Sequence, residues 1–302
     1  MIITTKLRSL SARSLVLAAL FCVLLGRGLQ YFLKSETPLR TFIWSEDAFG
    51  TVLGWFGIPW TDFANSMSAS RALDFLEASI GLFFLALAAV ALRELCTQRH
   101  TMAFRRTLWG LVPFFFVAAA AEFKNSGLQL AHLVEVSAMT FTPLMFLVMW
   151  NARGELRTTS SLWFLRLVIA LTFFGHGMYA LGYGYAQPGR FIDMTISILH
   201  CDESFARAFL KVAGALDVWI AWICLTLRPI ALVSLTLLWA TIWGFATATA
   251  RVWANFSPDF VQSSLVDWVP EMIVRLPHGL LPLALWLSFS CHTRRSTKTK
   301  YQ

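Results

Sequence analysis

Long apolar runs constrain this chain more than any other feature. Eight of them occur, near residues 14–33, 73–92, 107–123, 133–150, 162–182, 209–227, 229–250 and 272–290. Most approach the ~20 residues that a helix needs to cross ~30 Å of hydrocarbon. Only 14% of the 302 residues are charged, whereas soluble domains have about 25%. We therefore predict an all-α polytopic membrane protein, a bundle of about eight transmembrane helices.

The basic residues indicate an orientation. Fifteen of the 25 lysines and arginines fall in short segments on one side of the predicted spans, and nine lie in longer segments on the other. Short basic loops face the cytoplasm, so we expect an inner-membrane protein with both termini cytoplasmic. The net charge of +8 is spread between the spans rather than gathered on one soluble face, which argues against nucleic-acid binding. The first run continues without a signal-type cleavage site and is interpreted as a retained span.

Two long segments on the outer side are rich in tryptophan. Residues 38–70 contain Trp44, Trp55 and Trp60, and residues 253–268 begin and end with tryptophan. Tryptophan prefers the headgroup layer, so we expect short helices along the outer interface. A lid over the bundle is the alternative.

Four pairs of short motifs recur in the same order along the chain, which suggests a tandem repeat. Four crossings per unit would make the repeats parallel, with units at residues 1–152 and 153–302. The pairs are Gly26-Arg27-Gly28 with Gly175-His176-Gly177, Pro38-x-Arg40 with Pro188-x-Arg190, Arg71-Ala72-Leu73 with Arg207-Ala208-Phe209, and Thr142-Pro143-Leu144 with Leu281-Pro282-Leu283.

Two stretches combine a polar residue with an apolar run: residues 166–177, from Arg166 to the Gly-His-Gly notch, and the apolar segment 76–82 with Glu77. They resemble the DoxX-like family of small four-helix membrane proteins. Arg27 stands at the histidine position in the first half, and Asp217 is the looser counterpart of Glu77 in the second. However, aligning Arg71-Ala72 with Arg207-Ala208 pairs Glu77 with Ala213 rather than with Asp217. The resemblance implies a fold, and for some members a redox role linked to quinone.

Ionisable residues, His132 and Glu135 among them, gather toward the outer ends of the spans, while the cytoplasmic halves are nearly free of charge. A charge at mid-membrane costs about 2.5–3.5 kcal/mol, so such groups should face inward and pair. We therefore predict an outward-facing polar pocket closed by an apolar plug. Its candidate residues are Arg27, Glu77, Glu122, His176, Asp217, Arg251 and His278.

Each candidate also has a purely structural interpretation. His176 could cap a helix end between small residues that allow close packing, and His278 could be an interfacial histidine at a helix entrance. Glu122 and Arg251 end their spans and could snorkel to the interface. Glu77 and Asp217 lie deeper, where an ion pair with Arg27 or Arg251 would be the structural account.

The motifs of ordinary hydrolases, ATPases and zinc proteins do not occur, and the five cysteines stand singly. We therefore expect no metal site of a standard type. Histidines near carboxylates could still relay protons. Three hypotheses follow, in order: a redox subunit acting with a quinone or a small periplasmic substrate and a membrane redox partner, a small-solute transporter or binding module, and a structural subunit of a membrane complex.

Overall fold

The computed structural model describes residues 11–33, 37–99, 101–151, 159–226 and 230–299, and all regular structure in these ranges is helical. Seven segments there are long and apolar enough to cross a membrane. They are α2 (Ala12–Phe32), α6 (Met67–Thr97), α7 (Met102–Asn125), α10 (Thr159–Leu181), α12 (Glu203–Leu225), α13 (Ile230–Asn255) and the segment Pro258–Phe289. The prediction of a polytopic helical membrane protein is confirmed.

Large apolar side chains cover the outside of the bundle. Water would not tolerate so extensive an apolar surface, whereas lipid tails would. The exposed residues of this kind include Phe75, Leu82, Phe83, Val117, Val212, Trp219, Trp222, Leu235 and Ile242. The membrane-spanning helices α6, α7, α12 and α13 therefore contact lipid along one face.

The fourth and eighth apolar runs are each broken into two helices. In the fourth, α8 (Leu130–Glu135) ends at the C-cap residue Val136, and α9 (Ser137–Asn151) begins directly after it. With 15 residues, α9 is about 22 Å long, which is why it falls short of the length expected of a span. In the eighth, α14 (Val261–Arg275) and α15 (Pro277–Thr299) are separated at Leu276, because Pro277 has no backbone N–H to donate to the preceding turn.

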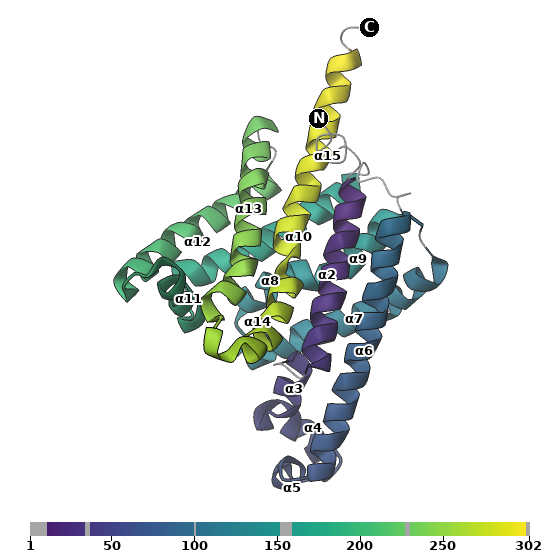
Figure 1. Ribbon diagram of the computed structural model, residues 1–302, viewed down its shortest axis with the longest axis vertical. Coiled ribbons are helices and arrows are strands. Elements are labelled where there is room, and N and C mark those ends of the chain that lie inside the picture. The colour runs from purple at the N-terminus through teal and green to yellow at the C-terminus, as the bar shows by residue number, and fades with distance from the viewer. Residues whose placement is uncertain (1–10, 34–36, 100, 152–158, 227–229, 300–302) are drawn as a thin grey trace.

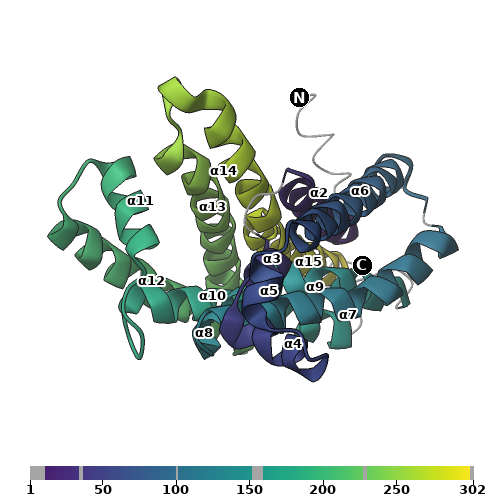
Figure 2. The same ribbon diagram turned by 90° about the horizontal axis from the view of Figure 1, so that it is seen from below.

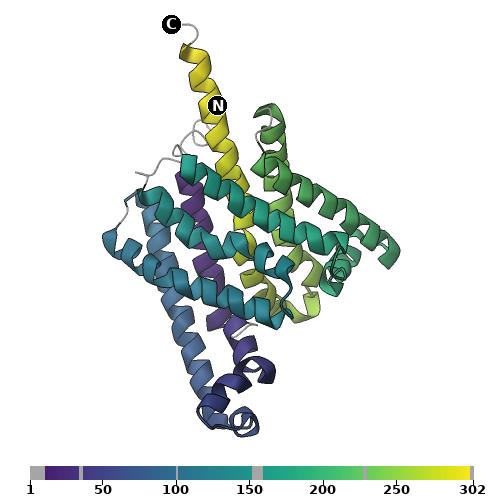
Figure 3. The ribbon, with the colours of Figure 1, turned by 180° about the vertical axis from the view of Figure 1, so that it is seen from behind.

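The long helices form two layers (Figures 1 and 2). In Figure 1, α2, α6, α13 and α15 run roughly lengthwise in the front layer, and Figure 3 shows α7, α9, α10 and α12 crossing them obliquely from behind. The first turn of α2 and the last turn of α15 lie at the same end of the molecule. Among the candidate spans, α2 and α10 are the most deeply buried, so they form the centre of the bundle.

Short helices occupy the opposite end, and those within residues 38–70 and 253–268 lie in the tryptophan-rich segments where short helices were predicted, whereas α11 lies outside both segments. They are α3 (Pro38–Ile43), the π-helical turn η1 (Glu46–Gly50), α4 (Thr51–Trp55) and α5 (Trp60–Ala64), with α11 (Gly189–Leu199) and the 3-10 turn η2 (Pro258–Phe260) in the second half. Phe63 contacts Trp44 and Trp60, with ring centroids 5.3 and 5.7 Å apart. This aromatic cluster holds α3 to α5 together beside the projecting end of α6 (Figure 1).

Glycines set the closest helix contacts. A Cβ at Gly175 would lie 2.5 Å from the backbone nitrogen of Glu135, and one at Gly177 would lie 2.8 Å from the carbonyl oxygen of Gly214. Only a residue without a side chain permits α10 to touch both α8 and α12 this closely. The residue between the two glycines, His176, is thereby fixed against α8.

Candidate functional site

An apolar cavity of about 240 Å³ lies between α10, α11, α12, α13 and the first turn of α15. Aromatic and aliphatic side chains form most of its wall, including Phe191, Leu210 and Trp243. On α13 the lining runs from Trp243 to Arg251, two turns of helix or about 12 Å. The cavity is large enough to hold a ring system or part of an acyl chain.

Three buried polar side chains line this cavity with an atom that has no partner. Asp217, Arg251 and His278 are only 4%, 4% and 3% exposed. Asp217 Oδ1, Arg251 Nε and His278 Nε2 have no hydrogen-bond partner in the protein. An unpaired buried polar group costs about 1–3 kcal/mol, and a charged one more. Three unpartnered polar atoms in one cavity indicate a binding site for a polar group.

The other atoms of these side chains are held in position. His278 Nδ1 lies 2.6 Å from the carbonyl oxygen of Arg275, and because a carbonyl only accepts, Nδ1 carries the proton. The Nε2 of the neutral ring therefore faces the cavity as an acceptor. Asp217 and Trp243 line the same cavity, and the Arg251 guanidinium lies 5.7 Å from the centroid of Phe191. The site thus offers one fixed acceptor, one donor and one carboxyl oxygen.

A second cavity of about 300 Å³ lies among α2, α3, α7, α8 and α14, and its lining is much more polar. Arg27 Nη2 donates to Glu122 Oε1 at 2.9 Å and Nη1 donates to Gln30 Oε1 at 3.1 Å. Gln30 Nε2 in turn donates to Glu271 Oε1 at 2.7 Å. We call this the outer polar cavity, because it lies toward the end of the bundle that carries the short helices.

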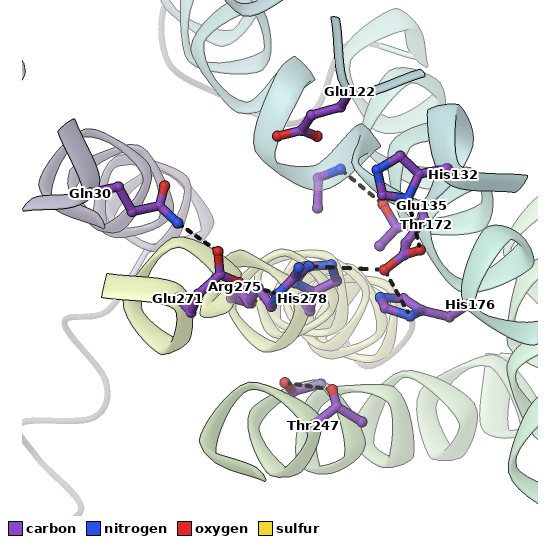
Figure 4. Close-up of polar contacts among 12 residues, drawn as sticks. Gln30, Glu122, His132, Glu135, Thr172, His176, Thr247, Glu271, Arg275 and His278 are labelled. Carbon is purple, nitrogen blue, oxygen red and sulfur yellow. Dashed lines mark hydrogen bonds and ion pairs between the residues drawn. The ribbon is translucent and has the colours of Figure 1, made fainter. Parts of the chain in front are cut away.

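Glu135 lies between His132 and His176 (Figure 4). Its Oε1 is 3.5 Å from His176 Nδ1, and its Oε2 is 3.8 Å from His132 Nδ1. His176 lines the apolar cavity, whereas His132 lines the outer polar cavity. Arg275 Nη1 approaches the same carboxylate at 3.9 Å. The Glu135 carboxylate raises the pKa of His132, the more accessible of the two histidines.

The seven residues predicted from the sequence divide among three places. His176, Asp217, Arg251 and His278 line the apolar cavity, and Arg27 pairs with Glu122 in the outer polar cavity. Glu77 lies in neither. It is fully buried, accepts from Thr37 Oγ1 at 2.5 Å, and accepts from Arg40 Nε at 2.8 Å. The structural interpretation of Glu77 as an ion pair therefore holds, with Arg40 as its partner rather than Arg27 or Arg251.

Sequence reasoning placed Glu135 and His132 near the outer ends of the helices but did not select them for the site. Their i, i+3 spacing places them on one face of a helix, and this spacing could have indicated that they act together. Gln30 and Glu271 were missed altogether, because they lie 241 residues apart and their contact depends on how α14 packs on α2.

Within the described residues, no group of three or more histidine, cysteine or acidic side chains is arranged to hold a metal ion. No family model, curated protein or solved structure matches this chain.

Proposed function

We propose that this membrane protein binds a lipid-soluble molecule with a polar head in the apolar cavity, and that the ligand is a quinone. The observation that carries the proposal is the set of unpartnered polar atoms on Asp217, Arg251 and His278 in an otherwise apolar wall. Ligand sites commonly combine apolar walls with a few convergent polar groups.

The polar atoms match the chemistry of a quinone and its reduced form. A quinone carbonyl would accept from Arg251 Nε, and a quinol hydroxyl would donate to His278 Nε2 or Asp217 Oδ1. Phe191 and Trp243 supply flat apolar surfaces for the ring. The same three polar atoms thus serve both redox forms of the ligand.

The rim of the cavity is open toward apolar surroundings. Leu199 and Ala246, both in the lining, are exposed on the outside of α11 and α13. Trp239 and Trp243 stack near this rim with ring centroids 6.0 Å apart. A ligand dissolved in the bilayer could therefore enter from the side, which favours a lipophilic ligand over a water-soluble substrate.

We also propose that the chain crosses the membrane eight times, with α9 as the additional crossing, as two parallel DoxX-like units. Close glycine contacts occur at matching positions in the two units, which supports the repeat. Gly26 meets Val274 on α14, and Gly175 meets Glu135 on α8. Val274 and Glu135 each lie eight residues before a helical proline, Pro282 and Pro143 respectively.

A second pair of glycine contacts extends the alignment of the two units and changes the proposed correspondence of Glu77 with Asp217. Gly81 meets Phe32 and Gly214 meets Leu181, and these partners each lie six residues after Gly26 and Gly175 respectively. Pairing Gly81 with Gly214 sets Glu77 opposite Leu210, not Asp217. The two acids are then independent features, in keeping with their different surroundings.

Binding of a short-chain benzoquinone to the protein in nanodiscs tests the proposed function. Wild type should retain quinone above the level of empty nanodiscs, and Arg251→Gln should weaken binding about tenfold or more, since a hydrogen bond to a charged group contributes about 1.5–3 kcal/mol. Arg207→Gln is the matched control, because Arg207 is exposed on α12 and forms an exposed i, i+4 ion pair with Glu203. Equal quinone uptake by wild type and empty nanodiscs, with Arg251→Gln changing stability alone, would instead leave the site as a structural network.

A further inference from the structure

One carboxylate joins the two cavities through two histidines. Glu135 is 5% exposed, and each of its oxygens faces a different imidazole, His176 on one side and His132 on the other. Figure 4 shows Glu135 between the two rings. The side chain of His132 is 30% exposed and that of His176 is 15% exposed, so solvent reaches this group most readily from the outer polar cavity.

In the part of the chain that the structure describes, charged and titratable groups from several neighbouring elements face the three residues, among them Tyr179 of α10, whose ring centroid lies 6.4 Å from that of His132. Arg275 of α14 faces Glu135 and both histidines, and Arg251 of α13 faces His176. His278 of α15 contacts His176 with ring centroids 5.2 Å apart, and Glu122 of α7 faces His132. Among the described residues, Glu135 is the carboxylate that approaches both imidazoles, whereas Glu122 faces His132 alone.

We propose that His132, Glu135 and His176 form a proton relay between the outer polar cavity and the apolar cavity. The relay rests on the proposed function only for the group that the proton finally reaches, which is the bound ligand. Histidine and glutamate are the side chains best suited to pass protons near neutral pH.

The transfer can be written with all protons conserved. Protonated His132 gives its Nδ1 proton to Glu135 Oε2, the carboxyl group turns about its Cγ–Cδ bond, and the same O–H then gives its proton to His176 Nδ1. His132 ends neutral, Glu135 returns to the carboxylate, and His176 becomes the imidazolium. Rotation of the carboxyl group about Cγ–Cδ carries the protonated oxygen from the side of His132 to the side of His176.

The two gaps are compatible with this role. Distances of 3.5 and 3.8 Å exceed a normal hydrogen bond, so a small side-chain rotation or one bridging water must close each gap at the moment of transfer. Glu135 is fixed at its backbone, because α8 is in close contact with Gly175. The side chain can therefore rotate while its base remains beside both cavities.

Exchange of the His176 imidazole proton with water, measured by NMR on histidine-labelled protein in lipid, tests the relay without any ligand. We expect Glu135→Gln to slow this exchange by about 100-fold, the lower end of what a positioned proton-transfer group contributes. His132→Gln should slow it as well, although Glu135 is intact, because the outer end of the relay is lost. Glu135→Asp should restore part of the rate if the carboxylate itself carries the proton.

His200 supplies the internal control, since it is exposed at the end of α11 and its exchange should be unchanged in every variant. Unchanged His176 exchange in both Glu135→Gln and His132→Gln would overturn the relay and show that protons reach His176 through the apolar cavity. Failure of quinone binding in wild type would contradict the proposed function and leave this measurement intact.

Discussion

Glu77 illustrates how this protein accommodates a charge within a membrane helix. The carboxylate is fully buried on α6, yet Thr37 and Arg40 from the neighbouring α3 bring donors to it. Arg40 also donates to Asp74 at 2.6 Å, one turn away on α6. A short helix outside the bundle thus neutralises a carboxylate inside it, and the pair ties α3 to α6.

Removing this carboxylate should destabilise the protein. We expect Glu77→Ala to lower the free energy of unfolding by about 3 kcal/mol, near the lower end for a broken buried ion pair, because Arg40 retains Asp74 and is partly exposed. Detergent-driven unfolding in mixed micelles would measure the change. Glu46→Gln, at an exposed position outside the spans, is the control. A loss no greater than that of the control would mean that α3 does not depend on the pair.

Asp217 differs from Glu77 in its partners. Both acids are buried on lipid-facing helices, but Glu77 has Arg40 as a partner, whereas Asp217 keeps one oxygen unpaired in a cavity. The sequence predicted that both would lie inside. It could not distinguish them, because the partner of Glu77 is on a short helix whose packing depends on the aromatic cluster of residues 44–63.

Two glycines allow α10 to pack closely against its neighbouring helices. Gly175 admits α8 and Gly177 admits α12, so His176 is oriented from both sides. The sequence identified the notch, and close packing through small residues was one of its two interpretations. The structure combines them, because the same glycines that allow close packing also bring Glu135 to His176.

Adding a methyl group in this notch should separate the helices. Gly175→Ala would place a carbon 2.5 Å from the backbone of Glu135, so we expect a loss of about 1–3 kcal/mol in stability, as for other overpacked cores. Gly110→Ala is the matched control, because a Cβ there meets nothing within 4 Å on α7, and alanine favours the helix by about 1 kcal/mol. Unfolding curves for the two variants should therefore shift in opposite directions; a shift of Gly175→Ala in the stabilising direction would refute the close contact.

The arrangement of the whole molecule explains what sequence analysis could and could not predict. Apolar runs of sufficient length specified the spans, and the basic loops indicated an orientation. The division of the polar residues into two cavities depends on the rotation of α10, α13 and α14 about their axes, which one sequence does not fix. Breaks at Val136 and Leu276 also create α8 and α14, the two short helices that carry Glu135, His132, Glu271 and Arg275.

The orientation of the molecule can be tested with one native cysteine. Cys96 is exposed near the end of α6, at the end of the molecule where α2 begins and α15 ends (Figure 1). Asp62 is exposed on α5 at the opposite end. With Cys201 and Cys291 replaced by serine, the basic loops predict that Cys96 faces the cytoplasm, so a membrane-impermeant maleimide should leave it unlabelled in right-side-out vesicles and label it after permeabilisation.

In the same background without Cys96, Asp62→Cys should be labelled before permeabilisation. The two positions then report opposite sides of one membrane, and the outer polar cavity opens on the side of Asp62. Labelling of Cys96 alone in intact vesicles would reverse the orientation and make His132 the cytoplasmic end of the relay. Labelling of both positions would contradict the assignment of α6 as a span, because Cys96 and Asp62 lie at the two ends of that helix and its attached short helices.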